Sequence, residues 1–204
     1  GISMRLAAGR CSGYNKRRQE NGGRKRFLPP SNFESEKSMT MSFTGFYPET
    51  IDFLWGIRLN NNREWFADNK GKYLDAKEEF ESFVEELIPM VQEMDPGIGH
   101  VTLSDCTYRI YRDTRFSADK TPYKNHFGAY INRHGKKSPY AGYYIHISPA
   151  EGSLWGGGLY CPEPEILKAV RRDIYENIDE FRSIIDAPEF KDRYTLSQEN
   201  KLKK

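Results

Sequence analysis

Large apolar side chains recur at seven-residue intervals over residues 62–94, and this pattern constrains the fold more than any other in the chain. Seven residues make about two turns of an α-helix, so the positions form one apolar stripe along a single face. The stripe comprises Phe66, Tyr73, Phe80 and Leu87, together with Ala76, Phe83 and Met90. The pattern therefore predicts one long amphipathic helix, which begins after Asn60–Asn62 and runs to about Met94.

A cap signal marks the start of this predicted helix, and a shorter helix precedes it. Asn61 followed by Glu64 fits a capping box, with asparagine in the place of serine or threonine. Upstream, the stretch FYPETIDFLWGIRL places Pro48 in a first helical turn, with apolar residues at helical spacing after it. We therefore expect a helix that starts near Pro48 and stops at the asparagine run.

Four strand-like segments follow, separated by turns rich in Asp, Ser, Lys, Pro and Gly. They cover about residues 106–112, 125–133, 140–148 and 153–160. Short connections between successive strands favour an antiparallel meander over parallel pairing. The segment PEPEILKAVRRDIYENIDEFRSII then predicts a helix. The order of elements predicts an α+β fold with N-terminal helices, an antiparallel four-stranded meander and a C-terminal helix packed on the sheet.

The basic residues are concentrated at the N-terminus. Residues 1–40 hold nine Lys or Arg and three Asp or Glu, whereas residues 41–204 hold 22 and 26. The leader has no helical or strand period, and we expect a disordered basic segment. The chain begins with Gly1, so we interpret the leader as an artificial or mis-assigned start, with Met39 or Met41 as a more natural one. Residues 41–204 are then expected to form a single domain.

Composition also narrows the classes of function. Cys11, Cys106 and Cys161 are far apart and odd in number, which signals neither a disulfide framework nor a zinc site. No apolar run is long enough for a membrane span, and the leader lacks the apolar core of a secretory signal. We therefore expect a cytoplasmic protein without metal or cofactor. The acidic balance of residues 41–204 disfavours nucleic acid as a partner, and nothing in the sequence indicates an oligomeric state.

Charged side chains gather in the stretch RIYRDTRFSADKTPYKNHFGAYI, residues 109–131. Three arginines with only two nearby acids leave a local excess of positive charge in an otherwise acidic domain. Guanidinium groups match the geometry of phosphate and carboxylate, so the stretch suggests a site for an anion. The predicted ligand-binding residues are Arg109, Arg112, Arg115, Lys120 and Tyr123, with Lys124 as an extension of the same pocket.

Three further residues of this stretch are candidates for catalysis. Asp113 or Asp119 would orient the arginines or act as a base, and His126 would move a proton. His126 and His146 lie on neighbouring predicted strands, where the two rings could face each other. No metal-ligand spacing supports a metal site there. A salt-bridge network between the arginines and internal carboxylates explains the same residues without any ligand.

The motif R-x-x-R-D-x-R-F-x-x-D-K-x-x-Y, which begins at Arg109 and ends at Tyr123, resembles that of a bacterial family, domain of unknown function 2461. NNNREWF upstream and GGGLYCPEPEILKAVR downstream extend the resemblance over residues 43–204. It implies an intracellular bacterial α+β protein whose hallmark is the charged stretch, and it brings no assigned activity. Members of the family continue further at the C-terminus, which implies that part of the domain is missing from this chain.

We therefore expect an enzyme or ligand-binding domain for a small anionic molecule, with a phosphorylated one as the natural candidate. Whether it catalyses a reaction is left open by the sequence. The alternative is a non-catalytic protein-interaction module whose Arg/Asp cluster is structural. Binding of single-stranded nucleic acid, with Tyr108, Tyr111 and Tyr123 stacking on bases, is a third hypothesis.

Overall fold

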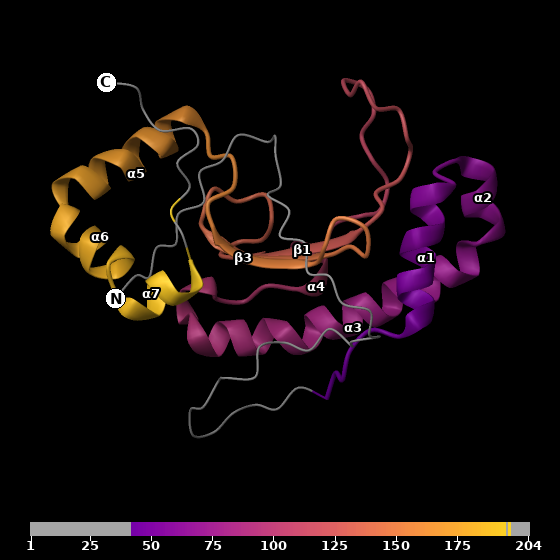
Figure 1. Cartoon of the computed structure of the whole chain (residues 1–204), viewed down its shortest axis with the longest axis horizontal. Coiled ribbons are helices and arrows are strands. Elements are labelled where there is room, and N and C mark those ends of the chain that lie inside the picture. The colour runs from indigo at the N-terminus through magenta and orange to yellow at the C-terminus, as the bar shows by residue number, and fades with distance from the viewer. Residues whose placement is uncertain (1–41, 195, 197–204) are drawn as a thin grey trace. The chain divides into compact units, whose positions relative to one another are not determined.

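The computed structural model of the chain describes residues 42–194 and residue 196 (Figure 1). The predicted leader, residues 1–40, lies outside the described residues. Within the described part, residues 42–157 belong to one compact unit, and the residues from Gly158 onward belong to another. The candidate site residues all lie in the first unit. The expectation of a single domain over residues 41–204 stays a prediction.

Helices dominate the start of the first unit. Helix α1 (Pro48–Leu59) has its proline in the first turn, as predicted, and ends at Asn60. The predicted long helix is divided into α2 (Arg63–Asp68) and α3 (Lys70–Met94). The prediction of one uninterrupted helix was wrong at Asn69, whose side-chain amide donates a hydrogen bond of 2.9 Å to the Trp65 carbonyl. Asparagine competes in this way with backbone helical bonds.

The predicted cap was wrong by one residue. The side chain of Asn62, rather than that of Asn61, accepts a hydrogen bond of 2.8 Å from the Trp65 amide and caps α2. Asn61 has another role, described below. After α3 the chain makes a short 3₁₀ turn, η1 (Pro96–Ile98), and the four-residue helix α4 (Leu103–Cys106).

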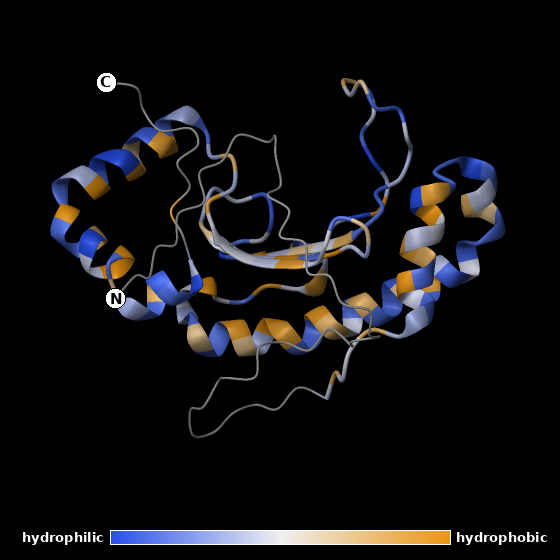
Figure 2. Ribbon diagram, in the orientation of Figure 1, coloured by the Kyte–Doolittle hydropathy of each residue, from blue (hydrophilic) through white to orange (hydrophobic). Residues whose placement is uncertain are grey.

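Helix α3 confirms the apolar stripe except at Met90, which is only half-buried. Figure 2 shows hydrophobic and hydrophilic residues alternating along it, as its amphipathic pattern requires. Its buried residues are Tyr73, Ala76, Phe80, Phe83, Val84, Leu87, Ile88 and Val91. The ring of Phe80 stacks on that of Phe127 from the sheet, with 5.2 Å between centroids. Burial of these side chains on one face therefore holds α3 against the sheet.

The described residues form a sheet of three antiparallel strands, in the order β1 (Phe127–Asn132), β2 (Gly142–Ile147) and β3 (Leu154–Gly158). The register of β1 with β2 pairs Gly128 with His146 and Ala129 with Ile145. The prediction of a four-stranded meander is not confirmed. Residues 106–112 make only an isolated bridge to β1, from Thr107 to Ala129, because the chain bends at Ile110 and turns away from the sheet.

The second unit consists of helices α5 (Pro164–Glu176), α6 (Ile178–Ile185) and α7 (Pro188–Arg193). The predicted C-terminal helix is interrupted at Asn177, whose side chain donates to the Asp173 carbonyl over 3.2 Å. Its packing on the sheet would depend on the placement of the two units and stays a prediction. Within the part of the chain that the structure describes, no helix has the length and apolarity to cross a membrane.

Candidate functional site

The arginine-rich stretch folds back on itself between α4 and β1. The Arg112 amide donates to the Pro122 carbonyl over 2.9 Å, and the Lys124 amide donates to the Ile110 carbonyl over 2.8 Å. Between these two hydrogen bonds, Tyr111 pairs with Tyr123 in an isolated antiparallel bridge. These contacts close the base of a loop formed by residues 113–121, which we call the arginine loop. The arginine loop projects from the sheet (Figure 1). It is mostly hydrophilic with a hydrophobic tip (Figure 2), where Phe116 is 96% exposed.

The base of the arginine loop is fixed to the start of α2. The Asn61 side chain donates to the Tyr123 carbonyl over 2.9 Å and accepts from the Tyr123 amide over 3.0 Å. The Tyr123 ring stacks on Phe66 with 4.0 Å between centroids. The NNNREWF stretch and the arginine-rich stretch, some fifty residues apart in sequence, therefore meet. Sequence reasoning missed the role of Asn61, because a polar run beside a helix is equally typical of a cap.

Arg115 is occupied by a carboxylate of the loop itself. Its Nε and Nη2 atoms donate to the two oxygens of Asp113 over 3.0 and 2.6 Å. This bidentate pair, with the Arg115 amide, lowers the pKa of Asp113 to about 2. Arg115 is 76% exposed, so the pair contributes little to stability. Sequence analysis placed both residues in the site, and the structure places them in the loop above its base.

Arg112 sits lower in the loop and is more enclosed. Its Nη1 atom donates to the Asp119 carboxylate and to the Thr121 hydroxyl, and its side chain is 25% exposed. The Thr121 amide also donates to Asp119, over 2.9 Å, and these hydrogen bonds lower the pKa of Asp119 to about 2. Lys120 donates to the Thr114 carbonyl over 2.9 Å. Asp119 therefore fixes the Arg112 side chain within the loop.

Two cations beside Arg112 are not held by an ion pair of this kind. Residues 109–126 carry five Lys or Arg side chains and two Asp. Among the described residues, neither Arg109 nor Lys124 forms an ion pair with a carboxylate, and the Lys124 ammonium lies 5.1 Å from the centre of the Tyr108 ring. Burial lowers the pKa of Lys124, and the charges of Arg109 and Arg112 lower it further. We call Arg109, Arg112 and Lys124 the cationic surface.

A pair of histidines lies next to the cationic surface. The rings of His126 and His146 are 4.2 Å apart, as their places on neighbouring predicted strands suggested, although His126 lies just before β1. Nδ1 of His146 is 3.0 Å from the Tyr144 hydroxyl. Burial lowers the pKa of His126 to about 3, with further contributions from His146, Lys124 and Arg112. Burial also lowers the pKa of His146. Both imidazoles are therefore neutral at neutral pH.

The histidine pair alone does not make a metal centre. In residues 42–194 and 196, no three side chains among His, Cys, Asp and Glu come together as metal ligands would. A protein metal site usually needs three or four such donors. The arrangement can instead offer hydrogen bonds, positive charge and a neutral proton acceptor to a bound molecule.

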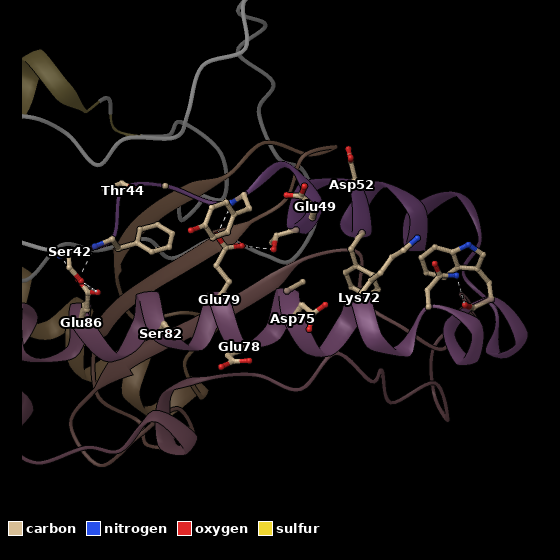
Figure 3. A pocket seen from close by; sticks show the side chains of 18 residues that line it. Ser42, Thr44, Glu49, Asp52, Lys72, Asp75, Glu78, Glu79, Ser82 and Glu86 are labelled. Atoms are coloured by element: carbon tan, nitrogen blue, oxygen red, sulfur yellow. Dashed lines mark hydrogen bonds between the residues drawn. The ribbon is translucent and has the colours of Figure 1, made fainter.

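A cavity of about 790 Å³ lies elsewhere in the same unit, between α1, α3 and the segment before α1 (Figure 3). None of the sequence-predicted site residues is among the residues that line it. Glu79 accepts from the Tyr47 amide over 2.7 Å, and Glu86 accepts from the Ser42 amide over 2.7 Å. These two acids of α3 therefore hold the segment before α1 in place. Most of the other charged residues that line the cavity are acidic: Glu49, Asp52, Asp75 and Glu78, with Lys72.

The fold and the charged stretch define an α+β protein that carries an arginine-rich loop clamped to the start of a helix. A family model described as "Conserved hypothetical protein (DUF2461)" matches residues 49–204. The chain belongs to this family, domain of unknown function 2461, as its motif suggested. No curated protein and no solved structure matches the chain.

Proposed function

We propose that the protein binds a small anion, such as a phosphorylated or carboxylated molecule, on the cationic surface. The observation that supports this most is that Arg109 and Lys124, beside Arg112, form no ion pair with a carboxylate among the described residues. Like charges held together destabilise one another, and an anion between them relieves that repulsion. Guanidinium and ammonium groups are also the usual partners of phosphate and carboxylate.

The other predicted site residues take supporting roles in this proposal. Asp119 orients Arg112, and its low pKa, about 2, makes it a poor general base near neutral pH. Asp113 is equally acidic and is held by Arg115. Tyr123 is 6% exposed and stacked on Phe66, so it supports the loop from below. The proposal is therefore one of binding, and it assigns no catalytic step to either aspartate.

Thermal unfolding in the presence of sulfate or inorganic phosphate tests this proposal. Both anions are expected to raise the melting temperature of the wild type, because a ligand that binds only the folded state stabilises it. Arg109→Met and Lys124→Met are expected to lose this rise. Arg115→Met is the matched control, since that guanidinium is bound to Asp113 in the exposed loop, and it should keep the rise.

Arg112→Met is less informative alone, because it also removes the partner of Asp119 and Thr121. The proposal fails if Arg109→Met and Lys124→Met respond to sulfate as strongly as the wild type does. A rise that is lost equally in Arg115→Met would point to general charge screening and would also contradict a specific surface.

A non-catalytic interaction module is the second candidate, and the exposed tip of the arginine loop favours it. Phe116 is almost fully exposed, with the Arg115 guanidinium 5.9 Å from its ring centre. Ion pairs within the loop would then serve to hold its shape for a protein partner. This candidate predicts that sulfate and phosphate change the melting temperature of the wild type and of both variants of the cationic surface by the same amount.

A further inference from the structure

We propose that His126 takes up a proton when an anion occupies the cationic surface, so that the site binds anions more tightly as the pH falls. The inference rests on the proposed anion site and adds a proton-linked residue to it. Its starting point is the position of His126, two residues after Lys124 and immediately before β1.

The geometry connects His126 to a pair of polar side chains on β2, buried His146 and half-buried Tyr144. The His126 ring faces that of His146 at 4.2 Å, and His146 meets the Tyr144 hydroxyl at 3.0 Å. Gly128 leaves room for this arrangement, because a Cβ atom there would lie 3.3 Å from the Tyr144 hydroxyl. His146 and Tyr144 therefore act as positioning residues, which keep the His126 ring beside the cations.

Groups from several neighbouring elements face His126. Arg112 and Lys124 come from the two sides of the loop base, and His146 comes from β2. Asn125 places its side-chain oxygen 3.3 Å from Nδ1 of His126. Glu151 follows β2, and its charge raises the pKa of His146. Its carboxylate also accepts a hydrogen bond of 3.4 Å from the Asn125 side chain and forms an ion pair of 3.5 Å with Arg58 of α1. Among the described residues, the charged side chains that act directly on His126 are thus positive, and Glu151 is paired with Arg58.

A bound anion reverses this balance. Without an anion, burial and the neighbouring cations keep the His126 imidazole neutral. An anion on the cationic surface offsets the repulsion from Arg112 and Lys124 and adds an attraction to the protonated ring, so the pKa of His126 rises. Two imidazoles 4.2 Å apart repel each other once both are charged, so the pair gains at most one proton. Binding and protonation then strengthen each other reciprocally.

Isothermal titration with sulfate at pH 6.0 and pH 7.5 tests the inference, since sulfate keeps its charge over this range. The affinity of the wild type is expected to be about fourfold higher at pH 6.0, for a bound-state pKa near the ordinary histidine value of about 6.5. Titrations in buffers of different ionisation enthalpy measure the number of protons that the protein takes up when sulfate binds, and this number should be a fraction of one. In His126→Asn the affinity ratio between the two pH values should fall to about one. His100→Asn, at an exposed histidine, is the control and should keep the wild-type ratio.

Ring resonances of the histidines give a second measurement that needs no variant. Sulfate is expected to raise the titration midpoint of the His126 ring in the wild type, and an unchanged midpoint would overturn the inference. Sulfate binding with equal affinity at both pH values would also overturn it, while leaving the anion site in place. If sulfate binds at neither pH, the anion site itself fails, and the proton linkage fails with it.

Discussion

Replacing Asn61 with alanine is expected to destabilise the protein by about 2–4 kcal/mol. The Asn61 side chain satisfies both backbone groups of Tyr123, with hydrogen bonds of 2.9 and 3.0 Å. Tyr123 is buried against Phe66, and a buried polar group left without a partner costs about 1–3 kcal/mol. Alanine removes both partners at once, so that the two penalties combine. Water that reaches one of the two groups would bring the loss to about 2 kcal/mol.

The neighbouring asparagines are matched controls for this change. Asn62 caps α2 through the Trp65 amide, so Asn62→Ala is expected to cost about 1 kcal/mol. The Asn60 side chain donates to the Gly56 carbonyl at an exposed position, so Asn60→Ala should change stability by no more than about 0.5 kcal/mol. Urea denaturation followed by circular dichroism measures all three. Equal and small effects for Asn60 and Asn61 would refute the view that Asn61 clamps the arginine loop.

The remaining predictions concern acid stability, the sheet and the loop tip. Between pH 7 and pH 5, His126 is expected to lower the free energy of unfolding by about 2 kcal/mol, because folding holds its pKa at about 3 and the unfolded chain protonates it near pH 6.5. In urea denaturation across this range, His126→Asn should therefore lose about 2 kcal/mol less than the wild type, in which the lowered pKa of His146 adds its own loss; an equal loss in the two proteins would contradict this. Gly142→Ala should destabilise by about 1–3 kcal/mol, since its Cβ atom would lie 2.3 Å from that of Asn132. Gly156→Ala has open space and should melt close to the wild type, so equal melting temperatures for the two glycine variants would contradict the packing argument. Phe116→Ser should change stability by no more than about 0.5 kcal/mol in urea denaturation, because that ring is exposed; a larger loss would show that the tip packs against the protein.

The elements with strong periodicity were predictable from the sequence. Burial of Phe80 and Leu87 on one face of α3 follows from their seven-residue spacing, because helix geometry alone decides which residues share a face. The strands around Ala129 and Ile145 follow from alternation in the same way. The break at Asn69 was not predictable, since a single asparagine inside an apolar stripe is usually tolerated within a helix.

The residues of the candidate site were predictable from the sequence, but the contacts between them were less so. The charge excess of residues 109–126 is visible in the sequence, but which arginine finds a carboxylate depends on the path of the loop. Arg115 meets Asp113 two residues away, whereas Arg112 reaches Asp119 across the loop. Tertiary contacts of this kind have no local signal. The clamp from Asn61 to Tyr123 spans 62 residues and could not be derived from spacing.

A crystal structure of the protein grown in sulfate tests the central claim most directly. The cationic surface predicts density for a sulfate ion within hydrogen-bonding distance of Arg109 and Lys124, with the ion pair between Arg112 and Asp119 still in place. Sulfate bound only elsewhere, at a concentration that raises the melting temperature, would contradict it. Arg109 and Lys124 each paired with a carboxylate of the same chain would contradict it equally.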